Sequence, residues 1–206
     1  MTKKEEIHKE IWNIWQLQLE VKHCFEYSYY LHKPETIEEE NYLKTSQDFR
    51  YIRLILWKMA VIELAKLFKE TDRFSIIRFI KKLKKDGYYG DLGVDSDVIN
   101  NWQKSIEENK SSIETIIKLR DKLYAHTDSA KEKYLYESIS FEQTKKLIEI
   151  VESVISEIYS VVLDSYADLS SPIFERKRFN IIKILSKAHE DRLEEFKLHF
   201  EERRKE

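Results

Sequence analysis

The sequence has little of what most folds use to turn the chain, with three glycines and two prolines among its 206 residues. A sandwich, barrel or propeller needs a turn signal about every ten residues, and these five residues cannot supply them. A few long helices need far fewer turns. The sequence therefore predicts an all-α fold, a bundle of long antiparallel helices.

Cysteine and net charge are also scarce. A single cysteine, Cys24, excludes an internal disulfide and a multi-cysteine zinc site. The formal net charge of −2 argues against a polycation that coats nucleic acid and leaves only local basic patches. No uncharged apolar run approaches the ~18 residues that a membrane span needs. We expect a cytoplasmic protein with no membrane partner.

What the chain does contain is enough apolar material for a sizeable core, 42% of residues, so the 36% that are charged are interpreted as helix surface. Apolar residues recurring at three and four predict helices over residues 4–31, 49–71, 75–85, 97–124, 140–162 and 172–206, and the helix over 97–124 either continues or restarts at Ser111. Possible capping boxes pair Ser111 with Glu114 and Ser140 with Gln143. Without a repeat or a linker, the chain is predicted to form one domain, 1–206, with 172–206 as an additional C-terminal helix that serves as an appendage or an interface.

The segment around Arg120 is the most informative in the sequence. Arg120 lies four residues after Ile116 and three after Ile117, so helical geometry places its charge on an apolar stripe. A buried, permanently charged group needs a partner or a ligand. His126 is six residues further on, about 120° round the helix. If both serve one site, the helix ends or bends near Ala125, or two protomers each contribute one residue.

This segment resembles the signature of HEPN domains. The run Arg-Asp-Lys-Leu-Tyr-Ala-His-Thr-Asp, beginning at Arg120, resembles the abortive-infection AbiU-type branch more narrowly. The resemblance implies an all-α HEPN-like bundle, a homodimer whose paired sites face one cleft, and a metal-independent endoribonuclease of a prokaryotic abortive-infection or toxin-antitoxin system. An antitoxin protein would then be a possible partner. The alternatives are a non-catalytic HEPN-like module that binds nucleotide, RNA or protein, and a plain helical scaffold.

The residue types suit RNA cleavage without a metal. The RNA 2′-hydroxyl attacks the adjacent phosphate, which requires proton transfer and a cation on the phosphate oxygens. Our hypothesis is that His126 moves the protons, since histidine titrates near neutrality, and that Arg120 stabilises the pentacovalent phosphate with its planar fork. Asp121 would orient Arg120 or fix the histidine tautomer. The structural alternative is that Arg120 pairs with a buried carboxylate and His126 caps a helix C-terminus.

Other residues could support this site. Glu63 lies on the apolar face of its predicted helix and needs a cationic partner, for which Arg120 is the first expectation and a separate structural ion pair the alternative. Tyr124 and Lys122 flank the site and could touch RNA, although plain solvation is the simpler expectation for Lys122. Arg53, four residues before Trp57, is interpreted as a surface cation whose stem covers apolar surface.

A basic segment, residues 66–85, is the predicted place for RNA phosphates. It holds eight basic residues against Glu70 and Asp72. The residues expected to bind RNA are Arg78, Lys81, Lys82, Lys84 and Lys85. Tyr88 and Tyr89 in the following loop could stack on bases. The alternative is an ordinary solvated helix face.

No metal or other cofactor is predicted. His8, His23, His32 and His199 show no ligand spacing with a carboxylate or a second histidine. His189 falls on the stripe of the last helix and is expected to be packed or interfacial. The three glycines follow no strand and precede no Gly-Lys-Ser/Thr, so they are not a phosphate-binding loop.

Overall fold

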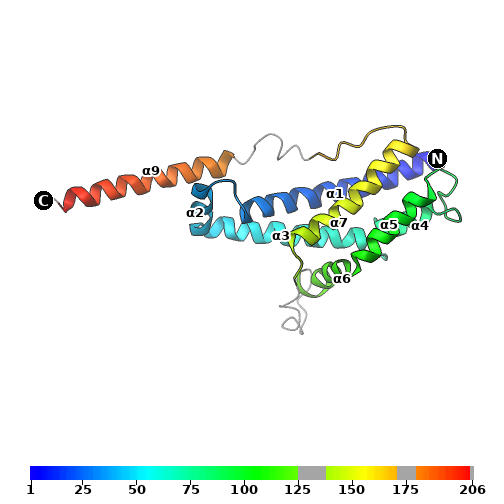
Figure 1. Cartoon of the computed structure of the whole chain (residues 1–206), viewed down its shortest axis with the longest axis horizontal. Helices are drawn as coiled ribbons and strands as arrows, with labels where there is room; N and C mark the ends of the chain where they lie inside the picture. Colours follow the sequence, from blue (N-terminus) through cyan, green and yellow to red (C-terminus); the bar gives the residue numbers. More distant parts are fainter. Residues whose placement is uncertain (125–137, 171–179, 205–206) are drawn as a thin grey trace. The chain divides into compact units, whose positions relative to one another are not determined.

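The computed structural model describes residues 1–124, 138–170 and 180–204, and all regular secondary structure within these ranges is helical. In chain order the elements are α1 (Lys3–His32), α2 (Ile37–Thr45), α3 (Gln47–Phe68), α4 (Ile76–Leu83), α5 (Ser96–Glu108), α6 (Lys110–Lys118), the π-helical turn η1 (Leu119–Tyr124), α7 (Phe141–Glu157), the π-helical turn η3 (Ile158–Val162) and α9 (Asn180–Arg203) (Figure 1). The predicted all-α fold is confirmed. No helix in the described ranges combines the length and the apolar character that crossing a bilayer requires.

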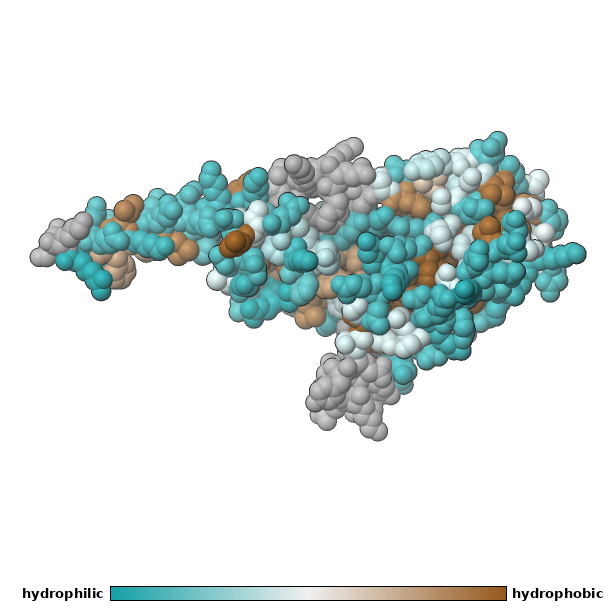
Figure 2. All heavy atoms as spheres, viewed as in Figure 1, coloured by the Kyte–Doolittle hydropathy of each residue, from teal (hydrophilic) through white to brown (hydrophobic). Residues whose placement is uncertain are grey.

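The helices form two compact units, and α1 and α3 each contribute to both. The first unit takes residues 1–24 and 58–170. Its core is made of large apolar side chains that are almost fully buried, among them Ile7, Ile11, Ile14, Leu64, Leu67, Phe68, Ile76, Phe79, Ile80 and Ile116. Polar contacts also tie α1 to α7 here, because Gln18 and Lys22 both donate to the Glu152 carboxylate at 2.7 Å. In the face shown in Figure 2, hydrophilic residues predominate, as expected for a helical protein rich in charge.

The second unit takes residues 25–57 together with α9. Its apolar cluster joins Tyr30 and Leu31 of α1, Leu43 of α2 and Ile182 of α9. His189 is half-buried and its ring lies 5.6 Å from that of Tyr42, which agrees with a packed histidine. Further along α9, the predicted apolar stripe is exposed at Leu193, Phe196 and Phe200.

Two local predictions differ from the structure. The polar stretch after Pro34 is a helix, α2, which begins with a capping box formed by Thr36 and Glu39. The capping box expected at Ser111 is wrong, because α6 begins at Lys110 with Asn109 as its N-cap and Ser111 lies inside the helix. The capping box of Ser140 and Gln143 is confirmed. The expected start of the last helix at Ser171 and Pro172 lies outside the described residues.

Candidate functional site

Arg120 is the second residue of η1, at the point where α6 widens into a π-helical turn. Leu119 keeps right-handed helical torsions, so the chain continues from α6 without a break, and its side chain is buried. The side chain of Arg120 is 19% exposed, as expected for a cation on the apolar side of its helix. π-Helical turns occur often at functional sites, because the extra residue in the turn changes the direction of nearby side chains.

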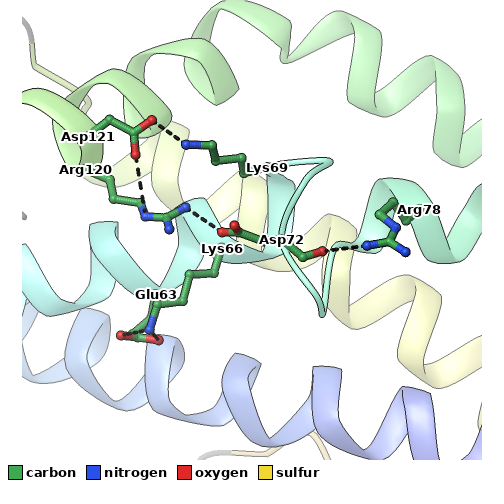
Figure 3. Close-up of polar contacts among 7 residues, drawn as sticks. All are labelled: Glu63, Lys66, Lys69, Asp72, Arg78, Arg120 and Asp121. Carbon is green, nitrogen blue, oxygen red and sulfur yellow. Dashed lines mark hydrogen bonds and ion pairs between the residues drawn. The ribbon is translucent and has the colours of Figure 1, made fainter.

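Carboxylates lie on two sides of the Arg120 guanidinium (Figure 3). Nη1 donates to Oδ2 of Asp72 at 2.5 Å, and Nε lies 3.7 Å from Oδ1 of Asp121. The other oxygen of Asp121 accepts a hydrogen bond from Nζ of Lys69 at 2.6 Å. Asp72, Arg120, Asp121 and Lys69 thus form a row of alternating charges, hereafter the Arg120 cluster. The row restrains the guanidinium in one orientation, since charge-assisted hydrogen bonds are short and directional.

The turn between α3 and α4 places Lys69 and Asp72 against η1. The Asp72 amide donates to the Lys69 carbonyl at 2.9 Å, and the Asp72 carbonyl accepts from the Ser75 amide and from Arg78 Nη1 at 3.3 and 3.4 Å. The Ser75 hydroxyl then caps α4 by accepting from the Arg78 amide. These bonds fix the backbone at Asp72, so its carboxylate is held toward Arg120.

The expectation that Glu63 pairs with Arg120 is wrong. Glu63 is buried on α3 and accepts from Nζ of Lys66, one turn later on the same helix, at 2.6 Å (Figure 3). Glu63 therefore forms the separate structural ion pair.

Burial, followed by the charges of Glu20 and Glu63, raises the pKa of the Cys24 thiol, so this cysteine stays protonated near neutral pH.

Much of the charge on the basic segment is already compensated within the first unit. Lys81 pairs with Glu70 at 2.5 Å and Lys82 with Glu10 at 2.7 Å. Arg78 contacts the Asp72 carbonyl, and its side chain is exposed together with those of Lys81 and Lys85, whereas Lys84 is half-buried. In the described part of the chain, Arg78, Lys84 and Lys85 form no ion pair, so uncompensated positive charge remains on α4 at Arg78 and just beyond its end at Lys84 and Lys85.

The two tyrosines of the following loop are not equivalent. Tyr89 is buried, packs near Phe79 and donates to the Glu10 carboxylate at 3.0 Å, so it does not offer a face for a base. Tyr88 is exposed and donates to the Glu6 carboxylate at 2.7 Å, a bond that raises its pKa. Of the two tyrosines, Tyr88 is therefore the one that exposes its ring.

His126 lies outside the described residues, so its distance from Arg120 is not given by the structure. Tyr124 is the last residue of η1, and its side chain also lies outside the described part. Lys122 is exposed on η1. Among the described residues, no three histidine, cysteine, aspartate or glutamate side chains are grouped as ligands for a metal ion.

Asp72 and Lys69 are the members of the Arg120 cluster that the sequence did not single out. Both entered the sequence argument only as charges of the basic segment. A single carboxylate in such a segment is a weak signal, because nothing in the local sequence distinguishes Asp72 from Glu70. Only the packing of the α3–α4 turn against η1 places Asp72, rather than Glu70, beside Arg120.

An all-helical fold with an arginine anchored at the end of a mid-chain helix is the arrangement expected of a HEPN domain. A family model described as HEPN AbiU2 matches residues 5–179, and the chain belongs to this abortive-infection-associated family. The match includes the whole Arg120 cluster and the segment that carries His126. It ends directly before α9. The chain matches no curated protein and no solved structure.

Proposed function

We propose that the protein is a metal-independent endoribonuclease that acts as a homodimer in a prokaryotic abortive-infection or toxin-antitoxin system. The observation that carries the proposal is the restrained guanidinium of Arg120, 19% exposed and fixed by Asp72 and Asp121 in a π-helical turn. Once a phosphate is bound, a positive charge restrained in this way stabilises a developing phosphorane, because the guanidinium needs little further reorganisation during the reaction. His126, six residues further on, supplies the proton transfers.

Lys69 also binds Asp121, so Asp121 can orient Arg120 without fully neutralising the guanidinium charge. Asp121 shares its two oxygens between Arg120 and Lys69. The four side chains together carry two positive and two negative charges, so an approaching phosphate must compete with Asp72 for the guanidinium. We infer that RNA binding replaces part of the Asp72 contact.

The dimer is supported by apolar exposure on α3. Tyr51, Ile52, Leu54 and Ile55 expose between 39% and 65% of their surface within five positions of one helix. Closely spaced apolar exposure of this kind is typical of protein interfaces. Light scattering of the purified protein, compared with Ile52→Glu, tests the oligomeric state.

Cleavage is tested with total RNA and purified protein in excess EDTA. The expected fragments carry 5′-hydroxyl and 2′,3′-cyclic phosphate ends, so polynucleotide kinase labels them at the 5′ end without prior phosphatase treatment. We expect His126→Ala to lower the rate at least about 100-fold, the usual contribution of acid-base catalysis. His199→Ala is the matched control, because His199 is exposed on α9 and contacts only Glu202 among the described residues.

Arg120→Lys separates catalysis from folding. Lysine keeps the charge that Asp72 needs but lacks the planar fork that matches two phosphate oxygens. We expect this variant to stay folded and to lose most of its activity, while Arg203→Lys, at an exposed arginine at the end of α9, keeps the wild-type rate. EDTA-sensitive cleavage, or an unchanged rate in His126→Ala, would contradict the mechanism.

A second candidate function is favoured by the carboxylates beside Arg120. Because Asp72 already pairs with the guanidinium, the cluster is also compatible with a module that binds RNA or nucleotide and cleaves nothing. This candidate predicts that the protein binds RNA and that Arg120→Ala weakens the binding. Neither the wild-type protein nor the variant would then produce RNA fragments. The same incubation, read by gel and by filter binding, distinguishes the two.

A further inference from the structure

A cavity of about 360 Å³ lies within the second unit, and it shares no residue with the Arg120 cluster. The cavity lies where the ends of three helices come together. Pro34 follows the end of α1, and the Thr36 capping box starts α2 soon afterwards. α3 then begins two residues after α2 ends. Its lining includes the apolar Leu31, Leu43 and Phe49. Four basic residues also line it, namely His32, Lys44, Arg50 and Arg53.

The basic residues reach the cavity from all three helices. His32 is the last residue of α1, and Lys44 lies in the last turn of α2. Arg50 and Arg53 are three residues apart near the start of α3 and therefore neighbours on one face. The side chains thus converge from separate elements, which a single charged helix face would not achieve.

The two arginines have no acidic partner among the residues that the structure describes. The one carboxylate of the lining, Glu40, is already paired with Lys44 at 2.7 Å. Within the described ranges, Arg50 and Arg53 form no ion pair. Arg50 donates to the Lys44 carbonyl at 3.3 Å, and Nη1 of Arg53 lies 3.4 Å from Nδ1 of His32.

This arrangement has an electrostatic consequence. Arg53 is half-buried, and its contact with Nδ1 of His32 does not neutralise the guanidinium charge. Cations placed together at an apolar wall repel each other, and an anion between them relieves that repulsion. Guanidinium groups bind phosphate oxygens with two parallel hydrogen bonds, so phosphate is the anion that suits two adjacent arginines best.

We propose that this cavity binds a phosphate-bearing nucleotide, either free in solution or at the end of an RNA strand. Its volume lies near the lower limit of ligand pockets, roughly 300–1,000 Å³, which fits one nucleotide rather than a dinucleotide. Arg50 and Arg53 hold the phosphate, and the half-buried ring of Phe49 stacks on the base. The proposal does not rest on the ribonuclease activity.

The test is calorimetric titration of the full-length protein with AMP, adenosine and inorganic phosphate. We expect AMP to bind, adenosine to bind at least about tenfold more weakly, and phosphate to compete with AMP. Arg50→Gln and Arg53→Gln should each weaken AMP binding about tenfold, because each removes a charge-assisted contact. Arg203→Gln is the matched control in the same unit, since Arg203 is exposed at the end of α9. Phe49→Leu should weaken AMP binding several-fold and leave phosphate binding unchanged.

The source of the nucleotide is resolved by a second titration. A short 2′-O-methyl oligonucleotide resists attack by its own 2′-position, so 5′-phosphorylated and 5′-hydroxyl forms can be compared even if the protein is a ribonuclease. Preference for the phosphorylated form assigns the site to RNA ends, and preference for AMP assigns it to free nucleotide.

Circular dichroism verifies that each variant is folded. If Arg53→Gln unfolds, Arg53→Lys replaces it and should weaken AMP binding by a smaller factor. The proposal is overturned if neither AMP nor the phosphorylated oligonucleotide binds at millimolar concentration. Equal weakening by Arg203→Gln would also overturn it, because binding would then follow net charge alone.

Discussion

Replacing Asp72 by asparagine should measure how strongly the protein holds Arg120. The two charged atoms are 2.5 Å apart, and the side chains of Arg120 and Asp72 are 19% and 24% exposed. Exposed ion pairs contribute about 0–1 kcal/mol, whereas removing one partner of a fully buried pair costs about 3–5 kcal/mol. A pair about one-fifth exposed lies between these limits, at about 2 kcal/mol. For a chain of this length, that corresponds to a decrease of about 4–8 °C in Tm.

A double-mutant cycle isolates the pair from other effects of the substitutions. We expect Asp72→Asn and Arg120→Gln to show a coupling energy of about 2 kcal/mol in urea unfolding, given the intermediate burial. Lys81 and Glu70 form a matched control, because their atoms are also 2.5 Å apart but both side chains are more than half exposed. Their coupling should stay below about 1 kcal/mol. A coupling near zero for Asp72 and Arg120, or one equal to the control, would refute the reasoning that burial makes this pair strong.

Two further predictions concern the first unit. Gly90→Ala should destabilise the protein more than Gly93→Ala in thermal unfolding, because a Cβ at Gly90 would meet the Lys84 carbonyl. Gly93 has open space around it, and only its positive φ of 83° opposes alanine. Equal losses of stability in the two variants would contradict this prediction. Burial, followed by the charge of Lys22, lowers the pKa of His23 below 6.5 in the folded protein. The unfolded chain therefore binds the proton more tightly than the folded chain. The contribution of His23 to stability is present above pH 6.5 and is lost below it. His23→Gln should flatten the fall in stability between pH 7 and pH 5, and an unchanged slope would exclude His23 as its cause.

The helices with strong apolar periodicity were the predictable part of the fold. The long stripe that begins at Ile7 predicts α1 to within one residue at each end, and Ser140 with Gln143 marks the start of α7. Periodicity failed for α2, whose nine residues are too short and too polar to show an apolar stripe. The capping-box spacing of Ser111 and Glu114 was also misleading, because both residues lie inside α6, which begins at Lys110.

Along the chain itself, the order of residues determined that the protein is all-α, that Arg120 lies on the inner side of its helix, and which family signature accompanies it. The shortage of glycine and proline favours helices, the helical period places Arg120 on an apolar stripe, and the run that begins at Arg120 carries the resemblance to the family, so each conclusion needs the sequence alone. The partners were decided by tertiary structure. Asp72 rather than Glu63 meets Arg120, and Arg53 lines a cavity, because the turns and crossings of separate helices determine which side chains come within reach of each other.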